Sequence, residues 1–483
     1  MKFTFENLGP IEKAELELGD LTLIAGRNNT GKTYVAHALY GFLKKIPEMI
    51  MAGDASTIFL ERHFKEVASL TIDELVEKLL KHGKHEWPLD DNEFAKTQKV
   101  LVKTIGEDFS SRFIFEVISV QKNRSTPVSL ELELNDYGFP DRLTNSFAAR
   151  RKMLFEYDGV TMTLSLIGDS TIDNPTKGDL FVERQVIRNS LMLTYSAIMT
   201  WQLNDNRVRP FILPSSRHSA PLFYKEVDYV NNQAVRGRGR LQLSNPGEPD
   251  SNLDSGIHDF ISQHYLPILD NVNFNREMPR IAERYENKPI NDTSRDIETM
   301  LGGFFHSRDS QIRFISNTGK KFDIPLASAS SSVWELSQLY FFLGYVLAFG
   351  DTNFLVIDEP ESHLDTANQI LLARLLARLV NSKIRVLITT HSDYLVKEVN
   401  NLIKLNSPFG RKEEVIGDLG YSHDHVLKPS AVKAYIAENR SLTRCEIDQY
   451  GIKMPVFDDT IDSINQISTE LTARIRMGSE DEQ

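Results

Sequence analysis

The 483 residues contain a single cysteine, Cys445, which excludes an internal disulfide framework and a thiolate metal site. Residues 1–20 have no apolar signal core and already show the pattern of strands. The longest apolar stretch, residues 339–349, is shorter than the about 20 residues that cross a bilayer. We therefore expect a cytoplasmic protein with no membrane partner.

Basic charge and repetition are also scarce. The formal net charge of −12 argues against a surface coated by basic residues, although a local basic groove is compatible with it. No heptad pattern is sustained, which argues against a long coiled-coil arm, and there is no internal repeat. The 41% of apolar and 25% of charged residues are typical of a globular chain. Its length fits one large domain with insertions, or two to three domains.

The first motif that carries chemistry is GRNNTGKT at residues 26–33, which fits the pattern G-x-x-x-x-G-K-[ST]. It follows an apolar strand at residues 21–25 and opens a helix, as the motif requires. Glycines let backbone N–H groups turn toward an anion, and the helix N-terminus adds partial positive charge. Lys32 would then reach the outer phosphates of ATP, and the Thr33 hydroxyl would ligate Mg²⁺. The predicted ATP-binding residues are Gly26, Arg27, Asn28, Asn29, Thr30, Gly31, Lys32 and Thr33.

A second motif, NFLVIDEP at residues 353–360, ends a strand. Four consecutive apolar residues indicate a parallel strand buried on both faces, which delivers two acids at its carboxyl end. We predict that Asp358 holds the Mg²⁺ shell and that Glu359 is the general base toward the attacking water. A further apolar strand at residues 387–391 ends on His391, a position suited to sensing or stabilising the γ-phosphate. Glu359 and His391 are thus the predicted catalytic residues.

Together, GRNNTGKT, LVIDEPESHLD and ITTHSDYL resemble the motifs of ABC-type ATPases of the SMC and RecF group. More narrowly, they resemble those of compact AAA-family ATPases related to the OLD nucleases. The resemblance implies an α/β fold, an ABC-type P-loop ATPase head with a mixed N-terminal sheet, a parallel core sheet and helical insertions. The expected boundaries are a head at 1–48, 110–220 and 306–420, a helical insertion at 49–109, a loop and helical insertion at 221–305, and a C-terminal helical tail at 421–483.

The same resemblance implies residues that meet a second protomer. Asp365 would lie in the loop that contacts the partner, and the signature segment, residues 328–339, would carry Ser331 across the partner's ATP. This segment has Ser332 where the family usually has glycine, so a plain serine-rich N-cap is the alternative interpretation. The glutamine that joins the lobes of such heads, and that we count as a metal ligand, is assigned to Gln121.

Two segments allow two interpretations each. Arg217 and His218 follow a short apolar run in a P-x-x-R segment common among compact ATPases. They lie either near the nucleotide or another ligand, or in a solvated loop, which is the interpretation that we favour. The basic run RGRGR at residues 236–240 either contacts nucleic-acid phosphates or forms a solvated face.

The resemblance implies that the chain hydrolyses ATP to ADP and phosphate, with Mg²⁺, as a nucleotide-clamped dimer or larger homo-oligomer. The chain is also similar to the ATPase subunits of anti-phage systems such as PARIS and Septu. This likeness implies a sensor and scaffold that holds and releases a separate effector, such as a Toprim or HNH nuclease, with DNA or a phage protein as trigger. One alternative is a RecF-like repair ATPase that binds DNA directly. Another is an ATP-binding scaffold with little hydrolysis.

Overall fold

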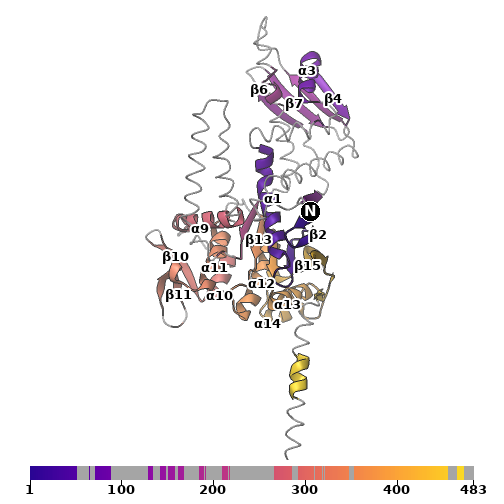
Figure 1. The fold of residues 1–483 in the computed structure, drawn as a ribbon. Coiled ribbons are helices and arrows are strands. Elements are labelled where there is room, and N and C mark those ends of the chain that lie inside the picture. Colours follow the sequence, from indigo (N-terminus) through magenta and orange to yellow (C-terminus); the bar gives the residue numbers. More distant parts are fainter. Residues whose placement is uncertain are drawn as a thin grey trace, which may run out of the picture. The chain divides into compact units, whose positions relative to one another are not determined.

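The computed structural model describes residues 1–51, 65, 71–88, 129–133, 142–147, 151–157, 161–167, 184–185, 187–189, 191, 209–215, 217, 266–285, 292–308, 311–317, 319, 321–346, 353–454 and 465–472. The chain divides into two compact units (Figure 1). Unit 1 comprises residues 1–8, 15–17 and 38–209, and unit 2 comprises residues 9–14, 18–37 and 210–483.

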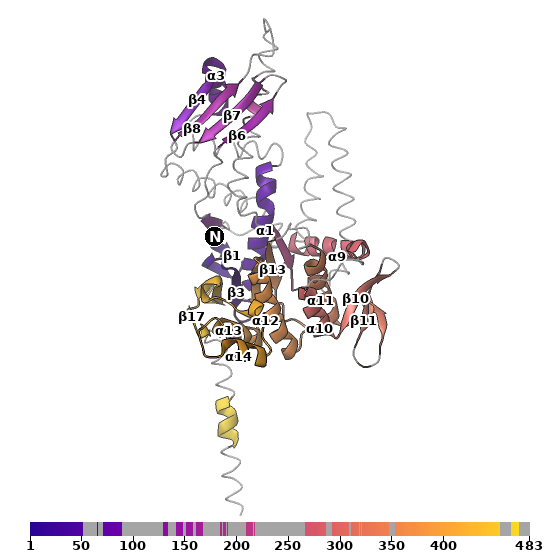
Figure 2. The ribbon, with the colours of Figure 1, turned by 180° about the vertical axis from the view of Figure 1, so that it is seen from behind.

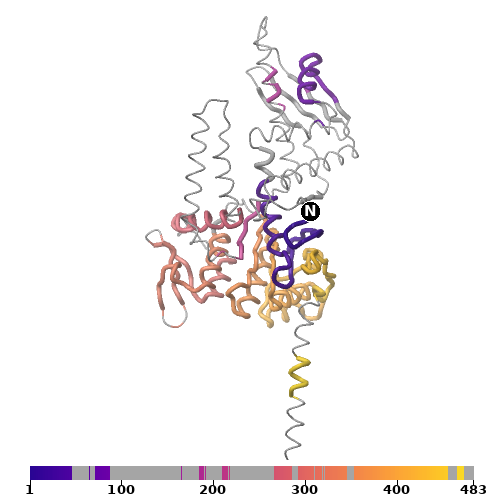
Figure 3. Tube along the Cα trace, in the orientation of Figure 1, coloured from indigo at the N-terminus to yellow at the C-terminus, as the bar shows by residue number. Residues whose placement is uncertain are grey.

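Unit 2 is built on a six-stranded sheet with the strand order β16-β15-β3-β14-β13-β9. All neighbours in this sheet are parallel except β16, which runs antiparallel to β15. The bounds are β3 Leu21–Ala25, β9 Pro210–Leu213, β13 Phe354–Asp358, β14 Arg385–Thr390, β15 Val432–Glu438 and β16 Ser441–Arg444. In the trace of Figure 3, strands from the beginning and the end of the chain lie side by side, because β3 pairs with β15.

The parallel register aligns the carboxyl ends of these strands at one edge of the sheet. Asp358 is level with Thr389, and both Thr390 and Ile436 are level with Ala25. The residues that follow β3, β13 and β14 therefore emerge next to one another. This is the edge at which open α/β sheets bind ligands.

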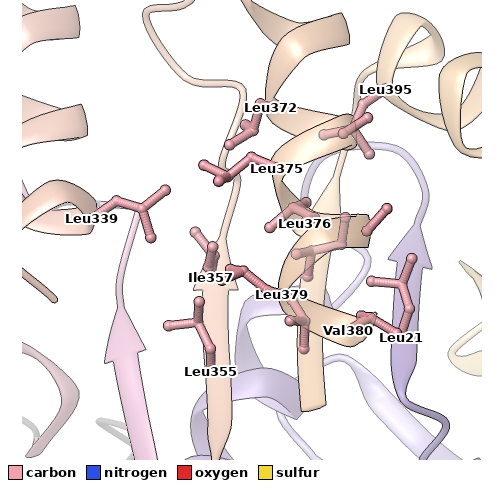
Figure 4. Close-up of a cluster of buried hydrophobic side chains, with 14 of the residues drawn as sticks. Leu21, Leu339, Leu355, Ile357, Leu372, Leu375, Leu376, Leu379, Val380 and Leu395 are labelled. Atoms are coloured by element: carbon pink, nitrogen blue, oxygen red, sulfur yellow. The ribbon is translucent and has the colours of Figure 1, made fainter. Parts of the chain in front are cut away.

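Helices cover the sheet because its inner strands are apolar on both faces, with every residue of β3 and β13 buried. α12 (Thr366–Asn381) joins β13 to β14, and α13 (Asp393–Lys404) follows β14. Figure 4 shows the leucines of α12, among them Leu375 and Leu379, in one cluster with Leu355 and Ile357 of β13. Burying each leucine of this kind contributes about 2 kcal/mol, so the cluster fixes the carboxyl end of β13.

The other elements of unit 2 surround this core. In both the front and the back view (Figures 1 and 2), α10 and α11 lie between the β10–β11 hairpin on one side and helix α12 on the other. The helices are α9 Leu266–Tyr285, α10 Asp292–Leu301, α11 Ser331–Phe341 and α14 Lys412–Asp418, with short helical turns η3 Leu326–Ser328, η4 Phe342–Val346, η6 His423–His425 and η7 Pro429–Ala431. The antiparallel strands are β10 Gly303–Arg308, β11 Gln311–Ser316, β12 Asp323–Pro325, β17 Ile447–Asp448 and β18 Gly451–Ile452.

β15 corrects one expectation. We assigned residues 421–483 to a helical tail, but residues 432–438 form an inner strand of the core sheet. Tyr435 and Ile436 are buried there, and β-branched and aromatic side chains of this kind favour a pleated, covered surface. A helix follows at residues 465–472, where the side chains are exposed.

Unit 1 contains a four-stranded antiparallel sheet with the order β4-β8-β7-β6, against which α3 packs. The bounds are β4 Lys84–Pro88, β6 Arg142–Phe147, β7 Arg151–Tyr157, β8 Thr161–Ile167 and α3 Ile72–His82. α3 lies in the segment 49–109 that we expected to be helical, and a capping box starts it. The Glu74 backbone N–H donates to Thr71 Oγ1 at 3.2 Å, and the Thr71 N–H donates to Glu74 Oε2 at 2.7 Å.

A second sheet has the order β2-β1-β5, with β1 Lys2–Leu8, β2 Ile11–Glu17 and β5 Ser129–Glu133. α1 (Lys32–Met51) begins in unit 2 and continues into unit 1.

The observed boundaries differ from the expected ones. β4 lies inside the segment 49–109, which we expected to be helical, and it pairs with β8. Unit 1 also takes in residues 110–209, which we assigned to the head together with residues 1–48. These boundaries were not predictable because β4 and β8, which pair with each other, come from distant parts of the chain. Pairing over such a distance leaves no local pattern in the sequence. None of the helices that the structure describes is long and apolar enough to span a membrane.

Candidate active site

The loop between β3 and α1 has a backbone that only certain residues adopt. Gly26 has φ +150° and Gly31 has φ +96°, and Asn29 lies in the left-handed region at φ 62°. A Cβ on Gly26 would approach the Ala437 carbonyl oxygen of β15 to 2.7 Å, and one on Gly31 would approach Ile11 Cγ1 to 2.9 Å. Both glycines are therefore needed where the motif has them.

Lys32 is the first residue of α1 and is buried. Its Nζ donates to the carbonyl oxygens of Gly26 at 3.1 Å and Arg27 at 2.8 Å. Burial lowers the pKa of Lys32, and the nearby carboxylates of Glu359, Asp358 and Glu361 oppose that shift. Its ammonium group therefore lies against the loop that the sequence predicted to cradle phosphates, while the side chains of residues 27–29 are exposed.

Asp358, the last residue of β13, is fully buried and is contacted from two elements. Its Oδ1 accepts a hydrogen bond from Thr33 Oγ1 at 3.2 Å and a second one from Thr389 Oγ1 on β14. His37 Nε2 lies 3.6 Å from Asp358 Oδ2. His37 was not among the predicted site residues, although it follows Thr33 by four residues and so shares its face of α1.

Glu359 and His391 meet at the ends of β13 and β14. Glu359 has φ 52°, and its N–H donates to Thr389 Oγ1 at 3.0 Å. Its Oε1 lies 3.0 Å from His391 Nε2. The hydrogen bond from His391 lowers the pKa of Glu359, although burial and Asp358 act in the opposite direction. Glu359 is therefore a carboxylate at neutral pH, as a general base must be.

Glu361 is a further acid that the sequence analysis missed. Its Oε1 accepts hydrogen bonds from Thr390 Oγ1 at 2.8 Å and from the His391 backbone N–H at 2.5 Å. Burial raises its pKa. Glu361 thus holds the turn after β14 that presents the His391 ring to Glu359.

Arg217 lies at this edge too, and its burial excludes the interpretation as a solvated loop. Only 3% of Arg217 is exposed, and its NH1 donates to the carbonyl oxygens of Asp358 at 3.0 Å and Pro214 at 3.1 Å. Its NH2 donates to the Glu359 carbonyl oxygen at 3.3 Å and forms an ion pair with the buried Glu335 of α11. Arg217 is therefore close to Asp358 and Glu359 and is not in a solvated loop.

The ionisation of Glu335 is expected to make stability depend on pH. Burial raises its pKa to about 7, while Arg217 lowers it and Glu359 raises it further. His363 Nε2 also faces Glu335, at 3.6 Å. Between the usual pKa and about 7 the folded chain binds a proton that the unfolded chain does not. The stabilising contribution is complete at low pH and is lost as the pH rises through about 7.

We therefore expect wild type to lose unfolding free energy relative to Glu335→Gln as the pH rises from about 5 to 8, by roughly 1.4 kcal/mol per pH unit at most. Urea unfolding of both chains at several pH values measures this difference. Glu414→Gln, at an exposed acid, is the control and should follow wild type. A constant difference between wild type and Glu335→Gln would contradict the assignment.

The residues predicted to meet a second protomer have local roles in the chain. Ser331 is the first residue of α11 and is exposed, and Ser330 is its N-cap, accepting from the Val333 N–H at 3.4 Å. Asp365 is the N-cap of α12, and its Oδ1 accepts from two backbone N–H groups at 3.0 Å each. Gln121, His218 and the basic run at 236–240 lie outside the described residues.

Thr33 and Asp358 fit a magnesium ion. Asp358 Oδ2 is buried and accepts no hydrogen bond from any residue that the structure describes, and the Thr33 hydroxyl lies beside the same carboxylate. Mg²⁺ prefers oxygen ligands and is usually held by one or two carboxylates together with substrate phosphates. A hydroxyl, a carboxylate and an adjoining phosphate-binding loop match that preference.

The fold and this edge of the sheet define an α/β P-loop ATPase head with a mixed sheet, as the sequence predicted. The family model described as AAA ATPase domain matches residues 1–144 and 254–396, more than half of the chain. The chain therefore belongs to the AAA ATPase domain family. No curated protein in the comparison matches it.

Solved structures of SMC heads are similar at low identity. The Smc head domain of Pyrococcus furiosus, with an extended coiled coil and bound to the C-terminal domain of ScpA, is 13% identical, with a TM-score of 0.33 over 97% of this chain and 98% of that chain. An SMC head bound to the C-winged helix domain of ScpA is 12% identical, with a TM-score of 0.30 over 82% and 90%. The SMC head domain of Thermotoga maritima is 11% identical, with a TM-score of 0.30 over 92% and 98%.

Proposed function

We propose that this AAA-family chain binds ATP with Mg²⁺ and hydrolyses it to ADP and phosphate. One observation supports this most directly: the carboxyl ends of β3, β13 and β14 bring Lys32 and Thr33 together with Asp358, Glu359 and His391. A cation, a hydroxyl and an ionised carboxylate at one sheet edge are the groups that phosphoryl transfer to water requires.

Each residue has a proposed task. The N–H groups of residues 26–33 and the Lys32 ammonium bind the phosphates, since the loop and the helix N-terminus both favour an anion. Thr33 and Asp358 would hold Mg²⁺, which neutralises charge on the phosphate oxygens when it is bound. Glu359 accepts a proton from the attacking water, and His391 orients that carboxylate through its 3.0 Å contact.

Steady-state phosphate release tests the proposal. We expect turnover with ATP and Mg²⁺, and a fall of at least about 100-fold when EDTA removes the metal, because Lewis-acid stabilisation of the phosphates is worth several kcal/mol. Excess Mg²⁺ should restore the rate, which controls for damage by the chelator. The proposed activity would be refuted by a rate of phosphate release no higher than background, or by a rate that EDTA leaves unchanged.

We further propose that ATP clamps two copies of the chain. In support, Ser331 is exposed at the N-terminus of α11, an eleven-residue helix, and Asp365 is exposed at the start of α12. In such a dimer the α11 N-terminus of one copy would face the γ-phosphate bound to the other. Ser332 in place of the usual glycine leaves a hydroxyl near that phosphate.

For the biological role we propose a sensor and scaffold in an anti-phage complex, which holds a separate effector and releases it on hydrolysis. The resemblance of the three motifs to defence ATPases supports this role. The test is to co-express the chain with the product of a neighbouring gene that encodes a Toprim, HNH or other toxic protein. Nucleotide-dependent co-purification is the expected result. Strong stimulation of the ATPase by gapped or duplex DNA, without such a partner, would favour a RecF-like repair ATPase instead.

A further inference from the structure

Arg217 contacts both the end of β13 and helix α11, and so links the proposed catalytic residues to a helix outside the sheet. Its guanidinium donates to the carbonyl oxygens of both catalytic acids, Asp358 at 3.0 Å and Glu359 at 3.3 Å. Among its described contacts none is to the P-loop. Arg217 therefore holds the end of β13 through the main chain of Asp358 and Glu359, and not through their carboxylates.

The same residue is held by α11 through three side chains. Glu335 forms the ion pair with its guanidinium, and Trp334 Nε1 and Gln338 Nε2 donate to its carbonyl oxygen at 3.4 and 3.2 Å. α11 is the helix whose first residue is Ser331. A shift of α11 along its axis would therefore break contacts to both the main chain and the side chain of Arg217.

From α11 the polar contacts continue to α9. Gln338 Oε1 accepts from Asn271 Nδ2 at 2.9 Å, and Asn271 Oδ1 accepts from Asn275 Nδ2 at 3.2 Å. All three side chains are buried. An apolar contact also joins α9 to the core sheet, because the ring centroid of Phe274 on α9 lies 4.8 Å from that of Phe211 on β9. Buried polar chains tolerate little displacement, because each broken bond leaves a desolvated group without a partner.

The Arg217–Glu335 ion pair, at the centre of this series of contacts, also faces the loop before α12. His363, at φ 60°, lies with Nε2 3.6 Å from Glu335 Oε1, two residues before Asp365. Both residues proposed to meet a second protomer are thus close in sequence to this contact: Ser331 precedes Glu335 by four residues on α11, and Asp365, the N-cap of α12, follows His363. A buried ion pair costs desolvation free energy that its attraction often fails to offset, so this one is better explained by positioning than by stability.

We propose that Arg217 is a positioning residue in a buried relay, Arg217–Gln338–Asn271, by which the placement of α11 and α9 sets the position of Glu359. This rests on the proposed ATPase activity. ATP binding is expected to be independent of the relay, and hydrolysis to depend on it. A partner that moves α9 or α11 would then change the rate of hydrolysis without touching the nucleotide.

Kinetics of Arg217→Met and Asn271→Leu test the relay. Both variants are expected to lower kcat by about 10- to 100-fold while the Kd for ATP changes by less than about threefold, as displacement of a catalytic group predicts. Asn271→Leu keeps the branched shape and the number of heavy atoms of the side chain and lies far along the relay, so it provides the test if Arg217→Met fails to fold. In the double variant the two losses should not multiply, because both break one chain of contacts.

Asn381→Leu is the matched control. Asn381 is an asparagine of unit 2 whose Nδ2 donates to the carbonyl oxygens of Asp424 at 2.6 Å and Val426 at 3.0 Å, outside the relay. It should keep the kcat of wild type. If wild type hydrolyses ATP and Asn271→Leu has the same kcat, the relay is refuted while the ATPase stands. If wild type neither binds nor hydrolyses ATP, the proposed function itself fails.

Discussion

Lys32→Ala is expected to weaken ATP binding by at least about 100-fold, equivalent to about 2.7 kcal/mol. The buried Lys32 Nζ lies against the loop carbonyls of Gly26 and Arg27, in the position from which an ammonium reaches phosphate oxygens. Hydrogen bonds to charged groups contribute about 1.5–3 kcal/mol each. The binding free energy lost with the Lys32 ammonium, in the first turn of α1, should therefore exceed any that the loop regains by relaxing.

Isothermal titration with ATP and Mg²⁺ measures this loss. Lys321→Ala removes an exposed lysine of unit 2 and should bind ATP like wild type. Because the carboxylates of Glu359 and Asp358 remain in the variant, their repulsion of the phosphates adds to the effect. Intact binding in Lys32→Ala would remove the P-loop from the nucleotide site, and with it the whole proposed function.

Glu359→Gln is expected to lower kcat by about 10²- to 10⁴-fold while ATP still binds. Glutamine keeps an oxygen within reach of His391 but accepts no proton from water at neutral pH. Glutamine also has the carbon skeleton of glutamate and so adds no backbone strain at φ 52°, and the fold at the end of β13 should survive. The proposed ATP-clamped dimer should therefore accumulate, and light scattering coupled to gel filtration should give twice the 55.0 kDa of one chain.

Glu413→Gln is the control, because Glu413 also contacts a histidine ring, that of His423, but at an exposed site. Its kcat and its mass in solution with ATP should match those of wild type. Normal turnover by Glu359→Gln would remove Glu359 as the base. Slow turnover without a dimer would keep the base and refute the clamp.

The parts of the site that lie in contiguous motifs were predictable. The loop at residues 26–33, and the apolar strands that precede it and precede Asp358, are each visible in a few consecutive residues. Once both strands pair in parallel with β14, which lies between them, the residues at their carboxyl ends come together, as the contacts of Thr33 with Asp358 and of Glu359 with His391 show. Local sequence and sheet geometry thus give most of the proposed catalytic group.

The supports of that group were not predictable in the same way. Arg217 and Glu335 are separated by 118 positions, and a lone arginine in a proline-containing segment looks solvated, since arginine is almost never fully buried unless it is paired. β15 was missed because its partner, β3, is at the other end of the chain. Long-range pairing of this kind leaves no periodic trace in either segment.

The pairing of β3 with both β14 and β15 has a consequence for synthesis. The P-loop motif and β3 are made long before the neighbours of β3, which lie at residues 385–390 and 432–438. Contacts this distant in sequence form slowly, because a long stretch of chain must be closed before they stabilise anything. We therefore expect a nascent or prematurely terminated chain to carry the nucleotide motif without the two strands that flank β3.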